Sequence, residues 1–249
     1  MKAYKNNAQN NLEEMWIVWL IFGIVGCVFG ILMIFVLPPI GIGLLIAGGI
    51  FLYKATSHFQ RQSKIKNMRQ QPLTNYVIFD FETTGLNPRT DRIIQIGAVK
   101  VINGNVVDTF STYVNPMKNI TKKSIEINGI TNEMVMDAPT EDQALPDFFK
   151  FIYTFPVTAY NSSFDLSFLR EALKRMNMTA DIYSFDTLKI ARLYFPNLPN
   201  HRLSTVVNAI GGRIEKEHDA LSDCFGIKQI LDRVPLTNAI IEQHQSTSQ

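Results

Sequence analysis

Two acidic residues, Asp80 and Glu82, lie inside an apolar stretch and are the first candidates for chemistry. This stretch, Val77 to Phe81, is rich in β-branched and aromatic residues and leads into a Thr-Thr-Gly turn, which predicts a buried strand. Because side chains alternate along a strand, both carboxylates point to one face, about 7 Å apart. The alternative is an edge strand whose two acids are solvated.

A metal ion is the natural counter-charge for these two carboxylates. No Lys or Arg occurs between Gln70 and Pro88, and ionised carboxylates in an apolar strand are costly unless a positive charge meets them. Paired carboxylates suit hard cations that prefer oxygen ligands, such as Mg²⁺ or Mn²⁺. The strand therefore predicts a divalent-metal site.

A third acid, Asp165, lies on a predicted helix that ends near Met176. On that helix it shares an apolar stripe with Phe168 and Leu169, where an acid is unexpected unless it has a function. The alternative is an acid at the start of a helix, where the helix dipole favours negative charge.

The last candidates are His218 and Asp223. Asp223 falls on the buried stripe of a helix together with Ala220 and Ile227. Five residues of helix turn the chain through about 500°, so His218 and Asp223 cannot share one face of a continuous helix. His218 is therefore expected just before the helix, a position that suits a mobile base better than a fixed ligand. The alternative is a surface or capping histidine.

Length, net charge and cysteine content limit the number of domains and the kinds of site that the chain can contain. At 249 residues the chain has room for one ordinary domain and an additional module. The net charge of +2 provides no overall basic field for nucleic acid. Cys27 and Cys224 are far apart in the sequence, which indicates no disulfide framework or cysteine metal site and fits a reducing compartment.

The N-terminal part of the chain is apolar. After a polar lead, residues 1–14, no charged residue occurs from Met15 to Leu37, and a membrane-spanning helix needs about 20 such residues. Pro38-Pro39 is expected to break this helix before a second uncharged run, Ile40 to Tyr53. Residues 15–53 thus predict a transmembrane helical hairpin. A re-entrant second segment and a buried soluble hairpin are the alternatives.

A basic linker, residues 54–74, follows the predicted hairpin. Positive charge beside a span marks the cytoplasmic side, and it can contact anionic lipid, at about 1 kcal/mol per charge. A solvated linker is the alternative. We therefore predict a membrane protein whose remaining residues lie in the cytoplasm. The basic residues of this linker are Lys54, Arg61, Lys64, Lys66 and Arg69.

Residues 75–234 show the pattern of an α/β domain, with strands that become interspersed with helices; this predicts a mixed sheet covered by helices. The polar residues 235–249 are expected to form a flexible tail. Beyond the first strand, the predicted strands are Arg92–Ile102, Val106–Val114, Phe155–Tyr160 and Ile182–Phe185, with a hairpin turn at Asn103-Gly104. The first predicted helices are Thr121–Asn128 and, with Thr140 as its cap, Glu141–Tyr153.

Three of these segments, in this order, resemble the motifs of the DEDDh 3′→5′ exonuclease family: Phe79–Gly85, Asn161–Asp165 and His218–Asp223. This group includes the proofreading epsilon subunit of bacterial DNA polymerase III. The resemblance runs from about Tyr76 to Val234 and implies a ribonuclease H-like five-stranded sheet. Two positions depart from the family pattern. Asn128 stands where the family often has His, and Gln95 stands where it often has Glu.

The resemblance implies hydrolysis of phosphodiester bonds with two divalent ions, Mg²⁺ or Mn²⁺, and release of 5′-mononucleotides. Asp80 would bridge the two ions, Glu82 and Asp223 would complete the first site, and Asp165 would support the second. His218 would take the proton from the attacking water. The terminal nucleotide would be held by Thr83, Thr84 and Leu86, with Asn161 and Phe164 lining the site.

The resemblance leaves alternatives open. Single-stranded or 3′-end nucleic acid is the implied substrate, with DNA favoured, but the same chemistry could act on RNA or short oligoribonucleotides. A catalytically idle module that only binds nucleic acid at the membrane is another possibility. Loss of a catalytic acid would have favoured that module, and all of them are present. A polymerase or another protein partner is left open, because the sequence shows no polymerase domain and no clear clamp-binding segment.

Overall fold

The computed structural model describes residues 17–29, 31 and 38–237. The chain divides into two compact units, Met1–Gln70 and Gln71–Gln249. Both cysteines are free thiols, and Cys224 is buried.

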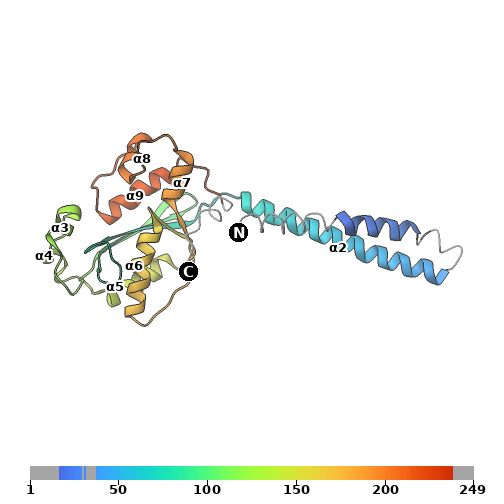
Figure 1. The fold of residues 1–249 in the computed structure, drawn as a ribbon, viewed down its shortest axis with the longest axis horizontal. Helices are drawn as coiled ribbons and strands as arrows, with labels where there is room; N and C mark the ends of the chain where they lie inside the picture. Colours follow the sequence, from blue (N-terminus) through green and yellow to red (C-terminus); the bar gives the residue numbers. More distant parts are fainter. Residues whose placement is uncertain (1–16, 30, 32–37, 238–249) are drawn as a thin grey trace. The chain divides into compact units, whose positions relative to one another are not determined.

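The first unit contains two helical segments that pack against each other. Residues 17–29 form one, and helix α2, Pro38–Gln70, forms the other (Figure 1). Glycines allow the close contact, since a Cβ atom added to Gly26 would lie 3.2 Å from Gly48 Cα. The rings of Trp19 and Phe51 meet edge to face with their centroids 6.2 Å apart.

Helix α2 corrects one prediction for this unit, that of a linker over residues 54–74. Pro38-Pro39 forms the first turn of this helix, where the N–H groups that proline lacks are not needed. The predicted end of the preceding span, residues 32–37, lies outside the described residues. The predicted basic linker, residues 54–74, is helical as far as Gln70. No Gly or Pro occurs from Lys54 to Gln70, and Lys, Arg, Gln and Ala are good helix formers.

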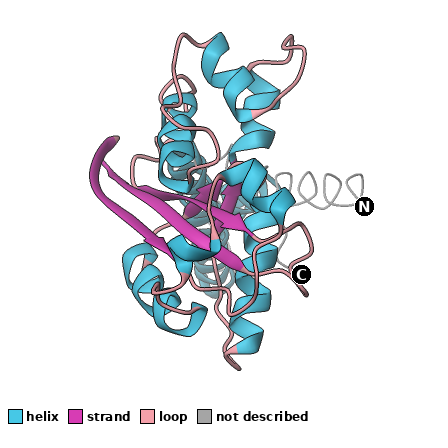
Figure 2. Ribbon diagram, turned by 90° about the vertical axis from the view of Figure 1, so that its left-hand side faces the viewer, coloured by secondary structure: helices cyan, strands magenta, loops and turns pink. Residues whose placement is uncertain are grey.

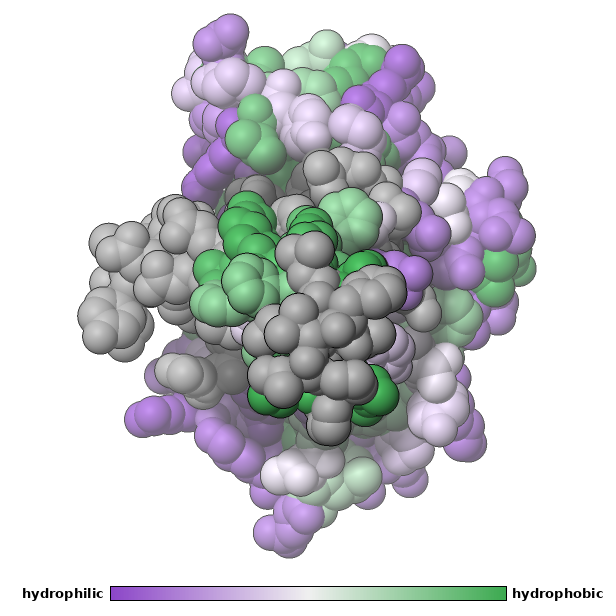
Figure 3. Space-filling model, turned by 90° about the vertical axis from the view of Figure 1, so that its right-hand side faces the viewer, coloured by the Kyte–Doolittle hydropathy of each residue, from purple (hydrophilic) through white to green (hydrophobic). Residues whose placement is uncertain are grey.

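The structure does not support the membrane part of the prediction. Within the described ranges, which omit residues 1–16, 30, 32–37 and 238–249, no helix combines the length and apolar character that a membrane crossing requires. The first predicted span, Met15–Leu37, lies partly outside those ranges. Hydrophobic residues nevertheless lie at the surface on the side that Figure 3 shows. In this unit, Ile21, Phe22, Phe29, Ile42 and Ile46 are each more than half exposed.

The second unit is built on a mixed five-stranded sheet in the order β3-β2-β1-β4-β5. Strands β1, Tyr76–Thr83, β2, Ile93–Ile102, and β3, Asn105–Tyr113, are antiparallel. Strands β4, Val157–Ala159, and β5, Ser184–Asp186, run parallel to β1. The predicted α/β fold with a mixed five-stranded sheet is confirmed, and the tight turn at Asn103-Gly104 joins β2 to β3.

Helices cover both faces of this sheet (Figures 1 and 2). One face packs against α5, Glu141–Ile152, and α6, Ser162–Arg175, and the other packs against α7, Thr187–Tyr194, and α9, Ala220–Leu231. The remaining helices are α3, Lys122–Asn128, α4, Asn132–Val135, and α8, Leu203–Ala209.

Alternation along β1 divides its side chains between the two faces. Phe79 packs into the cluster formed with α5 and α6, whereas Ile78 packs into the cluster formed with α7 and α9. Asp80 and Glu82 follow Ile78 at intervals of two residues, so they point toward α9. The alternation therefore places both acids on the face of the sheet that α9 covers.

Several boundaries differ from the predicted ones by one or more residues, and those of β4 and of the C-terminal tail have a clear physical reason. Strand β4 is shorter than predicted because Pro156 precedes it and the chain turns at Asn161, which adopts a left-handed backbone conformation with φ 66°. The predicted flexible tail begins with an ordered part: Leu236 is buried, and its carbonyl accepts a hydrogen bond of 3.0 Å from the Leu73 N–H. Residues 238–249 of that tail lie outside the described residues.

Candidate active site

Strand β1 supplies the first two acids of the site. It is a central strand, with β2 on one side and β4 on the other, so the alternative of an edge strand with solvated acids is wrong. Glu82 is buried at 8% exposure. The pairing with β2 shifts register between Glu82 and Thr83, which ends the regular ladder next to the acids.

The first turn of α6 supplies Asp165, which is 2% exposed. Its Oδ1 accepts a hydrogen bond of 3.1 Å from the N–H of Phe81. Strand β4 ends at Ala159 and pairs with β1 only at Val77 and Ile78. On the β4 side, the Phe81 N–H therefore has no strand carbonyl to bond, and Asp165 accepts its hydrogen bond instead. Asp165 is thus both a helix-start acid and a partner of β1.

His218 and Asp223 come from the N-terminal end of α9. His218 precedes the helix and has a positive φ of 60°, which places it outside the helix, as expected from the helical geometry. Asp219 caps the helix by accepting a hydrogen bond of 3.1 Å from the Ser222 N–H. Asp223 lies in the first turn.

These elements bring the candidates together. Ligand atoms of Glu82, His218 and Asp223 all lie within 4.8 Å of one another. These three residues also line a single pocket of about 430 Å³. The pocket is lined as well by all the other residues predicted for the site: Asp80, Asp165, Thr83, Thr84, Leu86, Asn161 and Phe164.

Burial and mutual repulsion change the acidity of the β1 carboxyls. Burial, followed by the negative charges of Asp223 and Asp219, raises the pKa of Asp80 to about 8. Burial and the charges of Asp80 and Asp223 raise the pKa of Glu82 to about 9, although a hydrogen bond from Asn128 opposes the rise. Both carboxyls would therefore hold protons at neutral pH unless a cation displaces them.

The two helix acids show the same trend. Burial and the charge of Asp80 raise the pKa of Asp165. Burial raises the pKa of Asp223 to about 6, while the nearby His218 acts in the opposite direction. Four crowded carboxyls beside one imidazole form a donor set of hard oxygen ligands, which fits a divalent cation such as Mg²⁺ or Mn²⁺.

Helix α3 contributes residues that the sequence did not indicate. Thr121, Lys123, Ser124 and Ile127 line the pocket, and the Ser124 hydroxyl donates a hydrogen bond of 2.8 Å to the carbonyl of Thr83. Asn128, which also lines the pocket, was noticed only as a departure from the family pattern. No sequence pattern predicts that the other residues line the pocket, because their position depends on how α3 packs against the end of β1.

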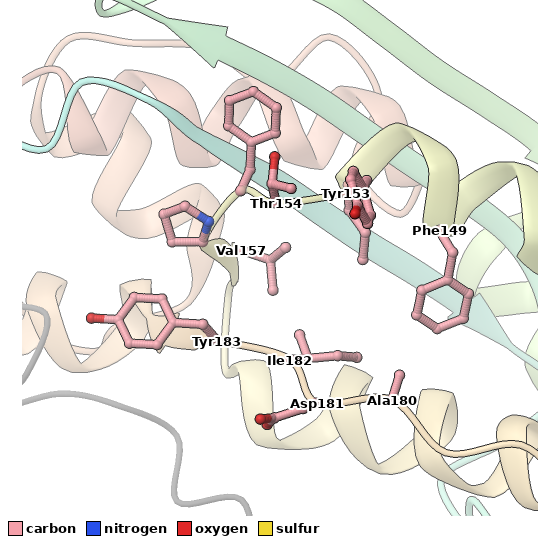
Figure 4. Close-up of a pocket in the computed structure, with 11 residues that line it drawn as sticks. Phe149, Tyr153, Thr154, Val157, Ala180, Asp181, Ile182 and Tyr183 are labelled. Atoms are coloured by element: carbon pink, nitrogen blue, oxygen red, sulfur yellow. The ribbon is translucent and has the colours of Figure 1, made fainter.

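A second cavity, of about 550 Å³, lies at the N-terminal ends of β4 and β5 (Figure 4). Its lining is largely apolar and aromatic, including Phe149, Val157 and Ile182, and Asp181 is its one acidic residue. This lining offers no group of ligands comparable with that of the first pocket.

The raised pKa values predict how the stability of the metal-free chain depends on pH. A carboxyl whose folded pKa lies above its unfolded value, about 4, favours folding most when it is protonated, so its contribution falls as pH rises toward the folded pKa. The free energy of unfolding in EDTA should therefore decrease between about pH 5 and about pH 9. Urea titrations across this range measure it, with Asp80→Asn as a control whose decrease is smaller. A stability that stays level or rises would contradict the assignment.

Comparisons with known proteins agree with this geometry. The Exonuclease family profile matches residues 77–231. Over 156 residues the chain is 40% identical to the DNA polymerase III PolC-type of Clostridium perfringens (strain 13 / Type A), an alignment that covers 63% of this chain and 11% of that protein. The chain thus spans about a tenth of the length of the curated relatives it matches.

Solved structures show the same fold. Exonuclease X in complex with 5′-overhanging duplex DNA aligns with a TM-score of 0.54 and 26% identity, covering 67% of this chain and 98% of that one. The E. coli exonuclease I complex with single-stranded DNA aligns with a TM-score of 0.58 and 22% identity, covering 64% and 39% of the two chains. At that identity the second likeness concerns the fold alone.

Proposed function

Because the chain belongs to the exonuclease family, we propose that residues 75–234 form a DEDDh 3′→5′ exonuclease. It hydrolyses the last phosphodiester bond at 3′ ends of nucleic acid, with DNA favoured, and releases 5′-mononucleotides. The observation that carries the proposal is the convergence of Glu82, His218 and Asp223, whose ligand atoms lie within 4.8 Å of one another. Asp80 and Asp165 line the same pocket.

In this proposal the four carboxylates hold two divalent ions, Mg²⁺ or Mn²⁺. When bound, the ions supply positive charge that activates water and stabilises the departing 3′ oxygen. His218 accepts the proton of the attacking water, because imidazole can change its charge near neutral pH. Asp165, held by the Phe81 N–H, keeps its carboxylate pointing into the pocket.

The other pocket residues suit the terminal nucleotide. Leu86 is 83% exposed at the pocket, so it offers an apolar surface against which a base can pack. Phe164, from α6, lines the same pocket, and Asn161 is positioned by its left-handed backbone at the start of α6. Thr83 and Thr84, at the end of β1, complete the proposed nucleotide site.

DNA is favoured as the substrate by the comparisons. The relative from C. perfringens is a DNA polymerase, and the solved structure of exonuclease X holds duplex DNA. RNA or short oligoribonucleotides are the second candidate, because hydrolysis at a 3′ end requires recognition of little beyond the backbone and the terminal sugar.

Digestion of matched 3′-labelled DNA and RNA strands by the full-length chain, with Mn²⁺ or Mg²⁺, tests the substrate. We expect faster release of labelled mononucleotide from DNA. Faster release from RNA would contradict the DNA assignment. Binding of both strands without release from either would favour an idle binding module.

We also propose that the N-terminal helical pair anchors the chain at a membrane, with the catalytic domain in the cytoplasm. Apolar side chains exposed along both helical segments, including Ile21, Phe29 and Ile46, support contact with lipid. The chain should sediment with membranes and require detergent for release. Release by high salt alone, or labelling of a single cysteine introduced at Ser246 by an impermeant reagent in intact cells, would contradict this proposal.

A further inference from the structure

A buried glutamine joins β2 to the start of α9. Gln95 is 4% exposed and pairs with Glu82 across the β1–β2 ladder. Both ends of its carboxamide form hydrogen bonds: Nε2 donates to Asp219 Oδ2 at 3.1 Å, and Oε1 accepts from the Ala220 N–H at 3.2 Å. Only a side chain that is both a donor and an acceptor can form this pair of bonds.

Asp219 uses its two carboxylate oxygens for different partners. Oδ1 accepts from the Ser222 N–H and caps α9, whereas Oδ2 accepts from Gln95. The side chain of Asp219 is therefore fixed between the helix and the sheet. His218 lies one residue before it, and Asp223 lies one turn after it.

The helix and the sheet are in direct contact at this point. A Cβ atom added to Gly97 would lie 2.3 Å from the carbonyl carbon of Ala220, so the start of α9 lies against the backbone of β2. The Cys224 thiol donates a hydrogen bond of 3.4 Å to the Gly97 carbonyl. Small displacements of α9 here would move Asp223 and His218 relative to Glu82.

We propose that Gln95 is a positioning residue, which sets the location of His218 and Asp223 relative to Glu82 through its paired bonds to Asp219 and Ala220. The amide is required because Asp219 is an acid. Glutamate at position 95 could still accept from the Ala220 N–H, but it would place a carboxylate against that of Asp219. This inference rests on the proposed exonuclease function, and Mn²⁺ binding provides a readout that does not require catalysis.

Reversal of the hydrogen-bond polarity tests the proposal. In the full-length chain, Gln95→Glu should lower both kcat and Mn²⁺ affinity by about 10–100-fold, as loss of a partner that orients metal ligands typically does. Adding Asp219→Asn should restore both to within about threefold of wild type. The new amide can donate to the carboxylate at position 95, while its oxygen still caps Ser222. Gln95→Leu, which removes both bonds, should not be rescued by Asp219→Asn.

A matched control comes from the same helix. The side-chain amide of Gln229 also forms a pair of hydrogen bonds with one residue, accepting from the Arg213 N–H at 3.0 Å and donating to the Arg213 carbonyl at 2.9 Å; it donates further to the Phe225 carbonyl at 3.4 Å. Gln229→Leu should lower Tm without changing kcat or Mn²⁺ affinity. Circular dichroism establishes that each variant is folded.

The outcomes separate the two proposals. Wild-type kcat and Mn²⁺ affinity in Gln95→Glu would overturn the positioning role. It would also be overturned if adding Asp219→Asn restored neither kcat nor Mn²⁺ affinity. An equal loss in Gln229→Leu would overturn it too, because any weakening of α9 would then suffice. If wild type releases no nucleotide, the exonuclease proposal fails, and loss and recovery of Mn²⁺ affinity still decide the role of Gln95.

Discussion

Asp80→Ala should abolish nucleotide release while leaving the metal-free chain as stable as wild type or more stable. Burial and neighbouring negative charges raise the pKa of Asp80 to about 8, so at higher pH the folded chain must hold an unfavourable charge. Removing the carboxylate relieves that repulsion but takes away one of the groups that would hold the divalent ions. Release rates with Mn²⁺ and unfolding in EDTA measure the two effects. Asp223→Ala should abolish release in the same way.

Asp165→Ala provides the contrasting case. Its Oδ1 accepts a hydrogen bond from the Phe81 N–H, and a buried donor left without a partner costs about 1–3 kcal/mol. This variant should therefore lose both release and metal-free stability. A marked loss of metal-free stability in Asp80→Ala would show that Asp80 has a structural role instead.

His218→Ala should lower kcat by about 10²–10⁴-fold, the effect typical of a lost general base, with Mn²⁺ affinity unchanged. The remaining activity should be greatest at a more alkaline pH, where hydroxide replaces the base. His201 provides a matched control, since its Nε2 lies 3.0 Å from the carbonyl of Phe195 and it does not line the pocket. His201→Ala should leave kcat unchanged.

The site geometry makes Mn²⁺ affinity the deciding measurement for His218. Its ligand atom lies within 4.8 Å of those of Glu82 and Asp223, which is close enough for a role as metal ligand. A large loss of Mn²⁺ affinity in His218→Ala would identify it as a ligand and would contradict the assignment as a base.

Local patterns predicted the parts of the fold that depend on neighbouring residues. Alternation along β1 placed Asp80 and Glu82 on one face, and helical geometry placed His218 before α9. The Asn103-Gly104 turn joins β2 and β3, as its sequence indicated. Each of these features depends on backbone preferences over a few residues.

Features that depend on tertiary packing were missed or misjudged. Gln95 and Asp219 are 124 residues apart in sequence, and no periodicity connects them. Lys123 and Ile127 line the pocket because α3 packs at the end of β1.

The direction of digestion tests the central claim most directly. The full-length chain is incubated with a single DNA strand labelled at the 3′ end or at the 5′ end, with Mn²⁺ or with EDTA. With Mn²⁺ the 3′ label should appear at once as a 5′-mononucleotide, while the 5′-labelled strand shortens step by step, and EDTA should stop both. Early release of the 5′ label, internal fragments, or no release with Mn²⁺ would contradict the account.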